Sequence, residues 1–376
     1  MKFSVNREEL VERLAAVAVT IPRKSSFPIV SNVLLEAQAG LVTLTGTDLS
    51  ARFVATLETD VDVVGEITVE AGLFRDVLDR FEAEVIECEW VEDRLAIRSL
   101  DDGEVMLQTM AATEYPQKGW AGTDQSFSVL LPRAWFTPIW KSVANHVASD
   151  DNRPVLRAVN LETHGEIVIL AATDGYRLGH WRGVTPQTWG EGDYTANLPA
   201  VAISDFLGHA PGDDVELTFN CELMKLTSGW LTAVVNLVDG NYPDYRPIIP
   251  TSHAGEYVIN KKLLVQASKL AEVIARSATN KPVVLMYADG VLEVRSATDA
   301  GKNAAICRDV RVKGQVETVA VNVAYLLSSL NAAQGELVAV QVTTPTSPIV
   351  VTDFREDGAE WKSIIMPIHT PPRLVD

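Results

Sequence analysis

Three regularly spaced carboxylates are the side chains of this sequence best placed to do chemistry. Asp48, Asp174 and Asp299 each follow a threonine and end a run rich in Val, Ile and Leu, at intervals of 126 and 125 residues. A carboxylate at a strand end can serve as a general base or nucleophile, as in a hydrolase. An active site, however, is normally asymmetric and combines several different groups. Because Asp also accepts hydrogen bonds from backbone N–H groups in turns, we interpret all three as turn residues.

Other signatures of catalytic or metal sites are absent from the sequence. It has no G-x-x-x-x-G-K-[ST] phosphate loop, no convincing G-x-G-x-x-G after a strand, no H-E-x-x-H and no cysteine pair with zinc spacing. The six histidines, at positions 146, 164, 180, 209, 253 and 369, are scattered. Cys88, Cys221 and Cys307 stand one in each third, which predicts buried, reduced thiols. We therefore expect no cofactor and no metal.

The Thr-Asp pairs belong to a longer repeat. Pro28, Pro154 and Pro282 each open the strand pair that ends at Thr-Asp. Each third closes on a further marker: Tyr115-Pro116, Tyr242-Pro243 and Met366-Pro367. Because the markers keep their order and period, the sequence predicts three equivalent domains, at 1–122, 123–253 and 254–376.

Hydrophobic periodicity predicts two amphipathic helices in each third. They lie near residues 6–19, 71–81, 133–148, 199–209, 260–281 and 322–334. Short strands separated by Gly, Asp or Glu turns occupy most of the remainder, for example near 32–36 and 41–45. The predicted fold class is α+β, with three tandem repeats of a domain in which two helices are backed by antiparallel sheet.

Charge is distributed unevenly between these elements. The net charge of −18 argues at first against a nucleic acid partner. The six helical segments, however, carry a net +4 and the remainder −22, and segment 260–281 is the most basic. A basic helical surface could face a polyanion while the rest of the protein repels it. The alternative is that lysine-rich helix faces are simply solvated.

The sequence gives no sign of membrane association. No run approaches the roughly 20 apolar residues that a membrane-spanning helix needs. The start, Met1-Lys2-Phe3, lacks the apolar stretch of a signal peptide. A soluble, cytoplasmic protein is predicted.

Six short motifs, in order along the whole chain, carry a resemblance to a known family. They are Met1-Lys2-Phe3, Phe27-Pro28-Ile29-Val30-Ser31-Asn32, Leu44-Thr45-Gly46-Thr47-Asp48-Leu49, Thr173-Asp174-Gly175-Tyr176-Arg177-Leu178, Asn241-Tyr242-Pro243-Asp244-Tyr245-Arg246 and Ile364-Ile365-Met366-Pro367-Ile368. Each motif is weak alone, but the series resembles the bacterial DNA polymerase III β subunits, the sliding clamps.

The resemblance implies a head-to-tail homodimeric ring of six domains, with helices lining a hole for duplex DNA and sheets outside. DNA would be held by topology, so weak, sequence-independent phosphate contacts suffice. A separate ATP-driven clamp loader would open the ring, and the clamp itself would not be an enzyme. Its partners would be DNA polymerase III, other polymerases and repair proteins, bound through short peptide motifs.

The family's peptide cleft is carried over onto matching positions of this sequence. It would comprise Leu156, Thr173, Gly175, Tyr176, Arg177, Leu178, Pro243, Pro247, Ile248, Ile364, Ile365, Met366, Pro367 and Ile368. Independently of the resemblance, segments 173–178 and 242–248 offer apolar side chains among turn residues, as peptide-binding grooves do. The alternative is that Tyr176, Leu178 and Ile248 only pack against their own domain.

Charged side chains are assigned to two further surfaces. The expected DNA contacts are Arg23, Lys24, Arg133, Lys141, Arg153, Lys261, Lys262, Lys269 and Arg276. The ring joint is expected to pair acids of the first domain with bases of the third, namely Asp101, Asp102 and Glu104 with Lys302 and Arg308.

Three departures from the family pattern keep a second hypothesis open. Residues 199–202 read Pro-Ala-Val-Ala where basic residues are common, Pro247 replaces a common basic residue, and the chain continues as a tail over 369–376. These features would suit a clamp paralogue or virus-encoded clamp that acts as a protein-binding scaffold with altered partners. A hydrolase using one Thr-Asp turn is the third reading.

Overall fold

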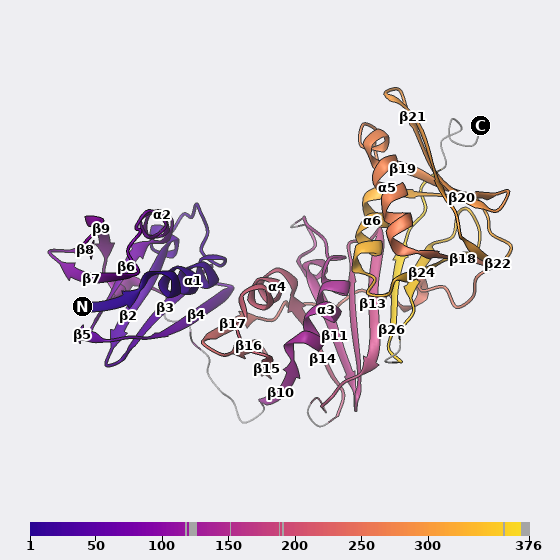
Figure 1. Ribbon diagram of the computed structural model, residues 1–376. Coiled ribbons are helices and arrows are strands. Elements are labelled where there is room, and N and C mark those ends of the chain that lie inside the picture. Colours follow the sequence, from indigo (N-terminus) through magenta and orange to yellow (C-terminus); the bar gives the residue numbers. More distant parts are fainter. Residues whose placement is uncertain are drawn as a thin grey trace. The chain divides into compact units, whose positions relative to one another are not determined.

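The structure, a computed structural model, describes residues 1–116, 119, 126–150, 152–187, 189, 192–355 and 358–369 (Figure 1). Its contacts divide the chain into two compact units. Unit 1 combines Met1–Trp135 with Val201–Leu237, and unit 2 combines Phe136–Ala200 with Val238–Asp376. The middle third of the sequence therefore contributes to both units. The predicted domain boundaries near 122 and 253 stay predictions.

All six predicted helices are present in the described ranges. They are α1 (Arg7–Ala18), α2 (Ala71–Leu78), α3 (Arg133–Ala144), α4 (Ala200–His209), α5 (Lys261–Ala275) and α6 (Val323–Ala332). Asparagines cap three of them, because the side chains of Asn6, Asn260 and Asn322 accept N–H hydrogen bonds from the first turns of α1, α5 and α6. The predicted α5 was too long, because the chain leaves it for a turn in which Asn280 and Lys281 have positive φ.

Unit 1 contains one antiparallel sheet of thirteen strands. In spatial order they are β10 (Phe127–Pro132), β15 (Asp214–Phe219), β16 (Leu223–Ser228), β17 (Leu231–Asn236), β4 (Ala51–Glu58), β3 (Leu41–Thr47), β2 (Asn32–Gln38), β6 (Gly65–Glu70), β9 (Gly103–Met110), β8 (Arg94–Ser99), β7 (Val85–Val91), β1 (Lys2–Asn6) and β5 (Val61–Val63). The sheet crosses from the middle to the first third of the sequence where β17 pairs with β4.

Unit 2 contains two antiparallel sheets. The nine-stranded sheet runs in the order β14 (Tyr194–Pro199), β11 (Ala158–His164), β12 (Ile167–Thr173), β13 (Arg177–Val184), β26 (Glu360–Ile365), β25 (Ile349–Asp353), β24 (Leu337–Val342), β18 (Gly255–Asn260) and β22 (Arg311–Gly314). The four-stranded sheet is β21 (Gly301–Cys307), β20 (Val291–Thr298), β19 (Pro282–Ala288) and β23 (Val319–Asn322). The nine-stranded sheet joins strands of the middle and last thirds of the sequence where β13 pairs with β26.

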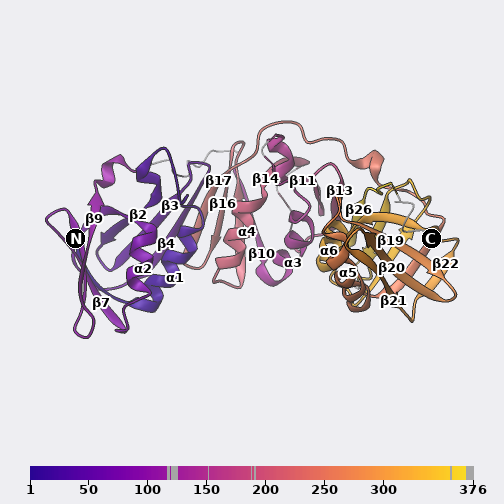
Figure 2. The same cartoon turned by 90° about the horizontal axis from the view of Figure 1, so that it is seen from above.

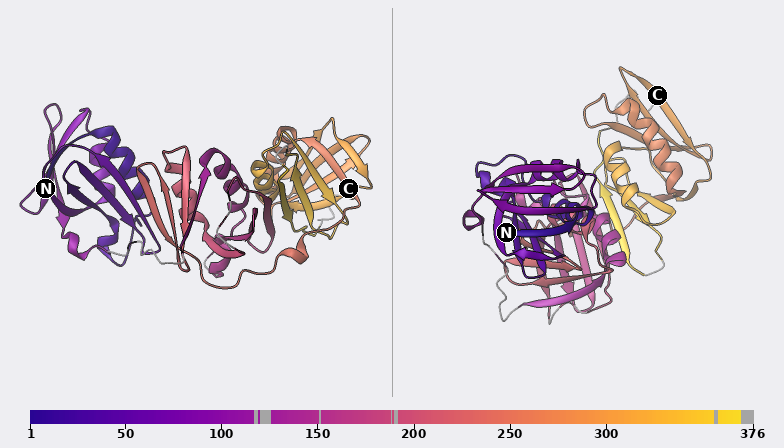
Figure 3. Two further views of the ribbon diagram at one scale, coloured as in Figure 1. Left: turned by 90° about the horizontal axis from the view of Figure 1, so that it is seen from below. Right: turned by 60° about the vertical axis from the view of Figure 1, so that its left-hand side comes forward.

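Helices cover one face of the sheets in each unit, with strand turns at the edges. In unit 1, α1 packs on β3 and β4 and contacts α2 (Figure 2). In unit 2, α5 packs on β20 and β21 and contacts α6 (Figure 3). Burial alternates along β4, as expected for a strand with one face on a core. The predicted α+β repeat of two helices and antiparallel strands is confirmed.

The Thr-Asp pairs of the first two thirds form the same turn. Thr47 Oγ1 donates to Ala51 O at 2.7 Å, and Thr173 Oγ1 donates to Arg177 O at 2.6 Å. Asp48 Oδ1 accepts the N–H groups of the residues two and three positions later, and Asp174 Oδ1 does the same. The turn interpretation is confirmed for these two carboxylates, because each accepts hydrogen bonds from backbone N–H groups of its own turn.

The cysteine prediction was correct in part. All three thiols are free, and Cys88 and Cys307 are buried. Cys221 is exposed, because it occupies the short turn between β15 and β16. The described chain has no helix that is both long and apolar enough to cross a membrane.

Candidate partner-binding cleft

A cavity of about 220 Å³ opens within unit 2. Four segments build it: the 3-10 helix Pro154–Arg157 with the residue before it, the turn between β12 and β13, the loop before β18, and the end of β26. The lining residues are Arg153, Leu156, Thr173, Gly175, Tyr176, Arg177, Leu178, Pro243, Asp244, Tyr245, Ile248, Ile364 and Met366. We call this cavity the cleft.

Strand pairing brings two distant parts of the chain to the cleft. On the β13–β26 ladder, Leu178 stands opposite Ile364. Past the end of β26, the Met366 N–H donates to Tyr176 O at 2.9 Å, which extends the pairing into the turn. The register therefore fixes which side chains of the C-terminal segment face the turn.

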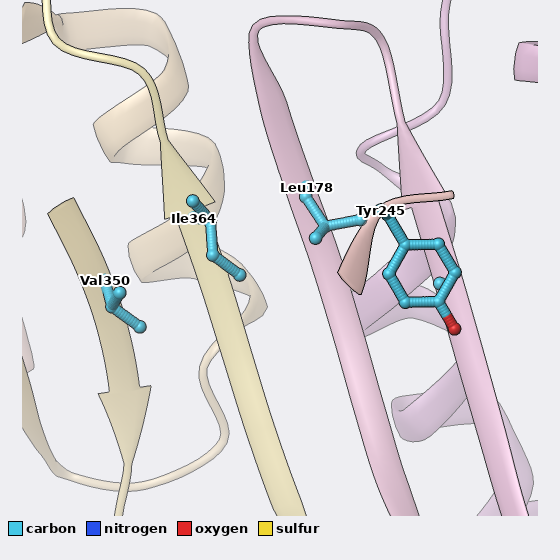
Figure 4. Packing of buried hydrophobic residues seen from close by; sticks show 5 residues of the cluster. Leu178, Tyr245, Val350 and Ile364 are labelled. Atoms are coloured by element: carbon cyan, nitrogen blue, oxygen red, sulfur yellow. The ribbon is translucent and has the colours of Figure 1, made fainter. Parts of the chain in front are cut away.

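The floor of the cleft is a buried apolar cluster. Leu178, Tyr245, Val350 and Ile364 pack together and are nearly inaccessible to solvent (Figure 4). Tyr176 and Ile248 at the mouth are instead 63% and 41% exposed. Exposed apolar side chains around an apolar floor leave surface that a partner can cover.

Polar groups at the rim are held in place by neighbours. Arg177 Nε donates to Asp174 Oδ2 at 3.0 Å, and its Nη2 donates to Asn145 O at 2.7 Å. The same guanidinium lies over the ring of Tyr325, 4.9 Å from its centroid, while Tyr176 stacks beside that ring at 6.5 Å. Arg177 is thus held at the edge of the cleft by an ion pair with Asp174 and by its contact with the ring of Tyr325.

The cleft's tyrosines are positioned as hydrogen-bonding groups and not as acids or bases. Tyr242 Oη accepts the Thr173 N–H at 3.0 Å, and burial raises the Tyr242 pKa to about 12. Tyr245 Oη donates to Glu162 Oε1 at 3.1 Å, and burial raises its pKa further. Both phenols stay protonated near neutral pH. Arg246 pairs with the second oxygen of Glu162, which ties the loop to β11.

A buried polar network lies behind the cleft. The His146 ring nitrogen Nε2 is 2.7 Å from Ser363 Oγ, which is 2.6 Å from Ser329 Oγ. Trp361 Nε1 donates to Ser142 O at 3.1 Å. These bonds join α3, α6 and β26. Because the network is fully buried, it fixes the strand that carries Ile364.

Acid is expected to destabilise the fold through two buried histidines. Burial lowers the pKa of His146 from 6.5 to about 3 and that of His180 from 6.5 to about 4. The unfolded chain therefore binds more protons below pH 6.5, so the stability from the neutral rings is complete above that pH and lost as pH falls. Between pH 7 and pH 5, the charging of each ring in the unfolded chain lowers the free energy of unfolding by roughly 2 kcal/mol.

Urea unfolding of the wild type and His146→Gln across this pH range checks the prediction. The glutamine keeps a polar side chain but does not titrate, so its stability should depend less steeply on pH. Equal slopes for both proteins would contradict the assignment.

The structure brings ten of the fourteen predicted cleft residues to the cavity. Pro247, Ile365, Pro367 and Ile368 are not among its lining residues. Ile365 is fully buried, because side chains alternate along β26 and Ile364 faces the cleft. Ile368 packs against Val284 and Ala320, and its N–H donates to Ala320 O at 2.9 Å.

Sequence reasoning missed four residues at or beside the cleft. Asp244 and Tyr245 lie within a quoted motif and could have been found from it. Arg153, assigned to DNA, lines the cleft, and its Nη2 donates to Asp174 O at 3.1 Å. Tyr325 carries no sequence signal, because its approach depends on the packing of α6.

The predicted DNA contacts divide into free-standing and tethered cations. Exposed side chains include Arg23, Lys24, Lys141, Lys262, Lys269 and Arg276. Arg133 Nε, by contrast, donates to Gly212 O at 2.7 Å, and Lys261 Nζ donates to Ala333 O at 2.7 Å. These two begin α3 and α5 and fasten the helices to neighbouring loops.

The predicted joint residues also have different surroundings. Asp102 accepts the N–H groups of Glu82 and Ala83, both at 3.0 Å, and these bonds lower its pKa. Glu104 pairs with Arg98 in the same hairpin. Lys302 is exposed on β21, and Arg308 is exposed just after that strand. Asp101 is exposed in the turn between β8 and β9.

In the described part of the chain, no group of three or more His, Cys, Asp or Glu side chains is arranged to hold a metal ion.

Comparisons with known proteins cover the whole chain. Family models described as the N-terminal, central and C-terminal domains of the DNA polymerase III beta subunit match residues 1–118, 131–244 and 246–369. The chain is 26% identical over 384 residues to a Streptomyces coelicolor protein named beta sliding clamp, with 98% of this chain and 99% of that one covered. The Escherichia coli beta sliding clamp is 26% identical over 375 residues, with coverage of 98% and 100%.

A solved structure of the beta subunit from the DNA polymerase of Streptococcus pyogenes has a TM-score of 0.90 and 23% identity. It covers 98% of this chain and 100% of that one, and it supports the fold.

Proposed function

The chain belongs to the DNA polymerase III β subunit family, the bacterial sliding clamps, and we propose that two copies close into a ring around duplex DNA. On the DNA, the ring would tether DNA polymerase III, other polymerases and repair proteins, after loading by a separate clamp loader. The family acts as a processivity factor, and we propose that this chain likewise catalyses nothing. Full-length agreement with clamps supports this function over that of a scaffold with altered partners.

The cleft carries the tethering part of the proposal. It offers an apolar floor, two exposed apolar side chains at its mouth and the fixed Arg177 at its edge. A short peptide with bulky apolar anchors would bury this surface, while Arg177 and nearby backbone groups would fix its direction. Because all these groups belong to one unit, the cleft is complete within a single chain.

The exposed cations support loose contact with DNA. Lys262, Lys269 and Arg276 are exposed along α5 and at its end, and Arg23 and Lys24 are exposed after α1. A few such charges neutralise a few phosphates, so binding stays weak and strongly salt-dependent. Weak contacts suit a ring that is held by topology and must move along its track.

Ring closure is proposed to use the edge of the four-stranded sheet in unit 2. Among the described strands, β21 pairs only with β20, which leaves one row of its backbone groups open to another chain. Beside this edge, Ile306, Leu270 and Val273 are 54%, 55% and 53% exposed. An open strand edge next to exposed apolar side chains is the surface a second copy would cover.

Leu270→Asp is therefore expected to convert a dimer into a monomer, because the charge would be buried without a partner. Inline mass determination with small-angle X-ray scattering should give twice the 41.0 kDa chain mass for the wild type and one chain for the variant. Val184→Asp, at a side chain 63% exposed on β13, is the control and should stay dimeric. A monomeric wild type would contradict the ring.

A further inference from the structure

Unit 1 contains a second cavity, of about 120 Å³, that no part of the proposed function uses. Its lining includes Thr47, Leu49, Arg52, Pro116, Val234 and Asn236. These residues come from the first Thr-Asp turn, the start of β4, the end of the first repeat and strand β17. We call it the second pocket.

The second pocket is the internal counterpart of the cleft. Arg52 stands opposite Val234 on the β4–β17 ladder, as Leu178 stands opposite Ile364 on β13–β26. The Asn236 N–H donates to Ser50 O at 2.9 Å, which matches the bond from Met366 to Tyr176 O. Strand register, turn hydrogen bonds and the closing proline all correspond. The comparison is geometrical and does not depend on what the cleft binds.

Two substitutions give the second pocket its own chemistry. Arg52 occupies the position of Leu178, and Asn236 occupies that of Met366. An Arg52 Nη1 hydrogen bond to Pro116 O, 2.9 Å long, fixes the guanidinium at the pocket wall. The pocket therefore offers a positive group and an amide where the cleft offers apolar side chains, and it should prefer an anion beside an apolar group.

Leu49 lies at the rim of the second pocket in a strained backbone conformation. Its φ is 76°, where the equivalent Gly175 has 92°. A left-handed conformation is strained for leucine and free for glycine. The side chain is also 50% exposed. Strain of this kind concentrates at binding sites, and here it keeps an apolar side chain at the pocket mouth.

We propose that the second pocket binds a short extended segment of a partner protein that presents one aliphatic side chain followed by a carboxylate. A cavity of roughly 150 Å³ holds a benzene molecule, so the second pocket has room for one aliphatic side chain. Leu49 and Val234 would contact that side chain. The Arg52 guanidinium would form an ion pair with the carboxylate. The cleft floor has the apolar Leu178 at the equivalent position.

The test uses the tripeptide N-acetyl-Gly-Leu-Asp-amide as the probe. Methyl NMR on the full chain with labelled Ile, Leu and Val reports both sites at once, because Leu49 and Val234 belong to the second pocket and Leu178 and Ile364 to the cleft. We expect saturable shifts at Leu49 and Val234. The matched probe ending in Asn should bind at least about fivefold more weakly, because it lacks the charge.

Two variants of the second pocket and one control variant of the cleft complete the test. Leu49→Gly suits the left-handed turn, so it should fold at least as stably as the wild type while probe affinity falls. Arg52→Gln should remove the preference for Asp over Asn. Ile248→Asp, at the cleft, should leave the shifts at Leu49 and Val234 unchanged.

Shifts confined to Leu178 and Ile364 would reject the second pocket and leave the clamp function standing. Equal affinity for the Asp and Asn probes, or shifts that Arg52→Gln and Leu49→Gly do not alter, would also overturn the proposal.

Discussion

Ile248→Asp is expected to abolish tethering of a polymerase while leaving the fold intact. Ile248 is 41% exposed and lines the cleft, so its replacement removes an apolar anchor surface and places a charge beside the apolar floor. Central anchors of this kind are worth about 2–4 kcal/mol, which corresponds to a loss of roughly 30- to 1000-fold in affinity. Primer extension on a long template, with the cognate polymerase and loader, should then give short products.

Val184→Asp is the matched control, because it places the same charge on an exposed apolar position of unit 2 outside the cleft lining. Its products should be as long as those of the wild type. Long products with Ile248→Asp would mean that partners bind somewhere other than the cleft.

Gly179→Ala is expected to destabilise unit 2, because the added methyl group would collide with the buried network behind the cleft. A Cβ at this position would lie 2.5 Å from Nδ1 and 2.8 Å from Cγ of His146. The ring cannot easily withdraw, because it is fully buried and bonded to Ser363. Overpacking of this kind costs about 1–3 kcal/mol, and loss of the ring's hydrogen bond adds to it.

Gly208→Ala provides a control of opposite sign. Gly208 lies on an exposed position of α4, and an added Cβ would meet nothing within 4 Å. Alanine should therefore raise the free energy of unfolding by up to about 1 kcal/mol. Both variants should be compared with the wild type by urea unfolding at one protein concentration. A Gly179→Ala protein as stable as the wild type would show that the network is looser than the structure indicates.

Much of the fold could be predicted from local features of the sequence. The helices could be predicted because their apolar residues recur at helical spacing and asparagines such as Asn6 and Asn322 cap them. The Thr-Asp turns could be predicted because a carboxylate followed by two N–H groups closes its own turn. The predictions that failed depended on where single elements end. The end of α5 depended on the turn that contains Asn280, and the exposure of Cys221 depended on where β15 ends.

The candidate site divides in the same way. The motif around Tyr176 and the segment ending at Met366 pointed to the cleft, because both lie in short apolar runs at turns. Tyr325 and Arg153 could not be assigned to the cleft from the sequence, because tertiary packing brings their side chains to it. Asp102 and Lys261 bond to backbone groups of their own chain, a contact that charge alone does not predict. Their assignments to the ring joint and to DNA stay predictions.

The most direct test of the central claim asks whether the protein is held on DNA by topology. A ring can thread onto linear duplex DNA through a free end. The protein would therefore be incubated with DNA that carries biotin at its ends. Streptavidin would then be added to cap those ends, and the complex would be washed in high salt. Electrostatic contacts are lost in salt, whereas a closed ring cannot leave capped DNA. We predict that the wild type stays on capped DNA and leaves uncapped DNA, while Leu270→Asp leaves both. Equal loss of the wild type from capped and uncapped DNA would contradict the ring.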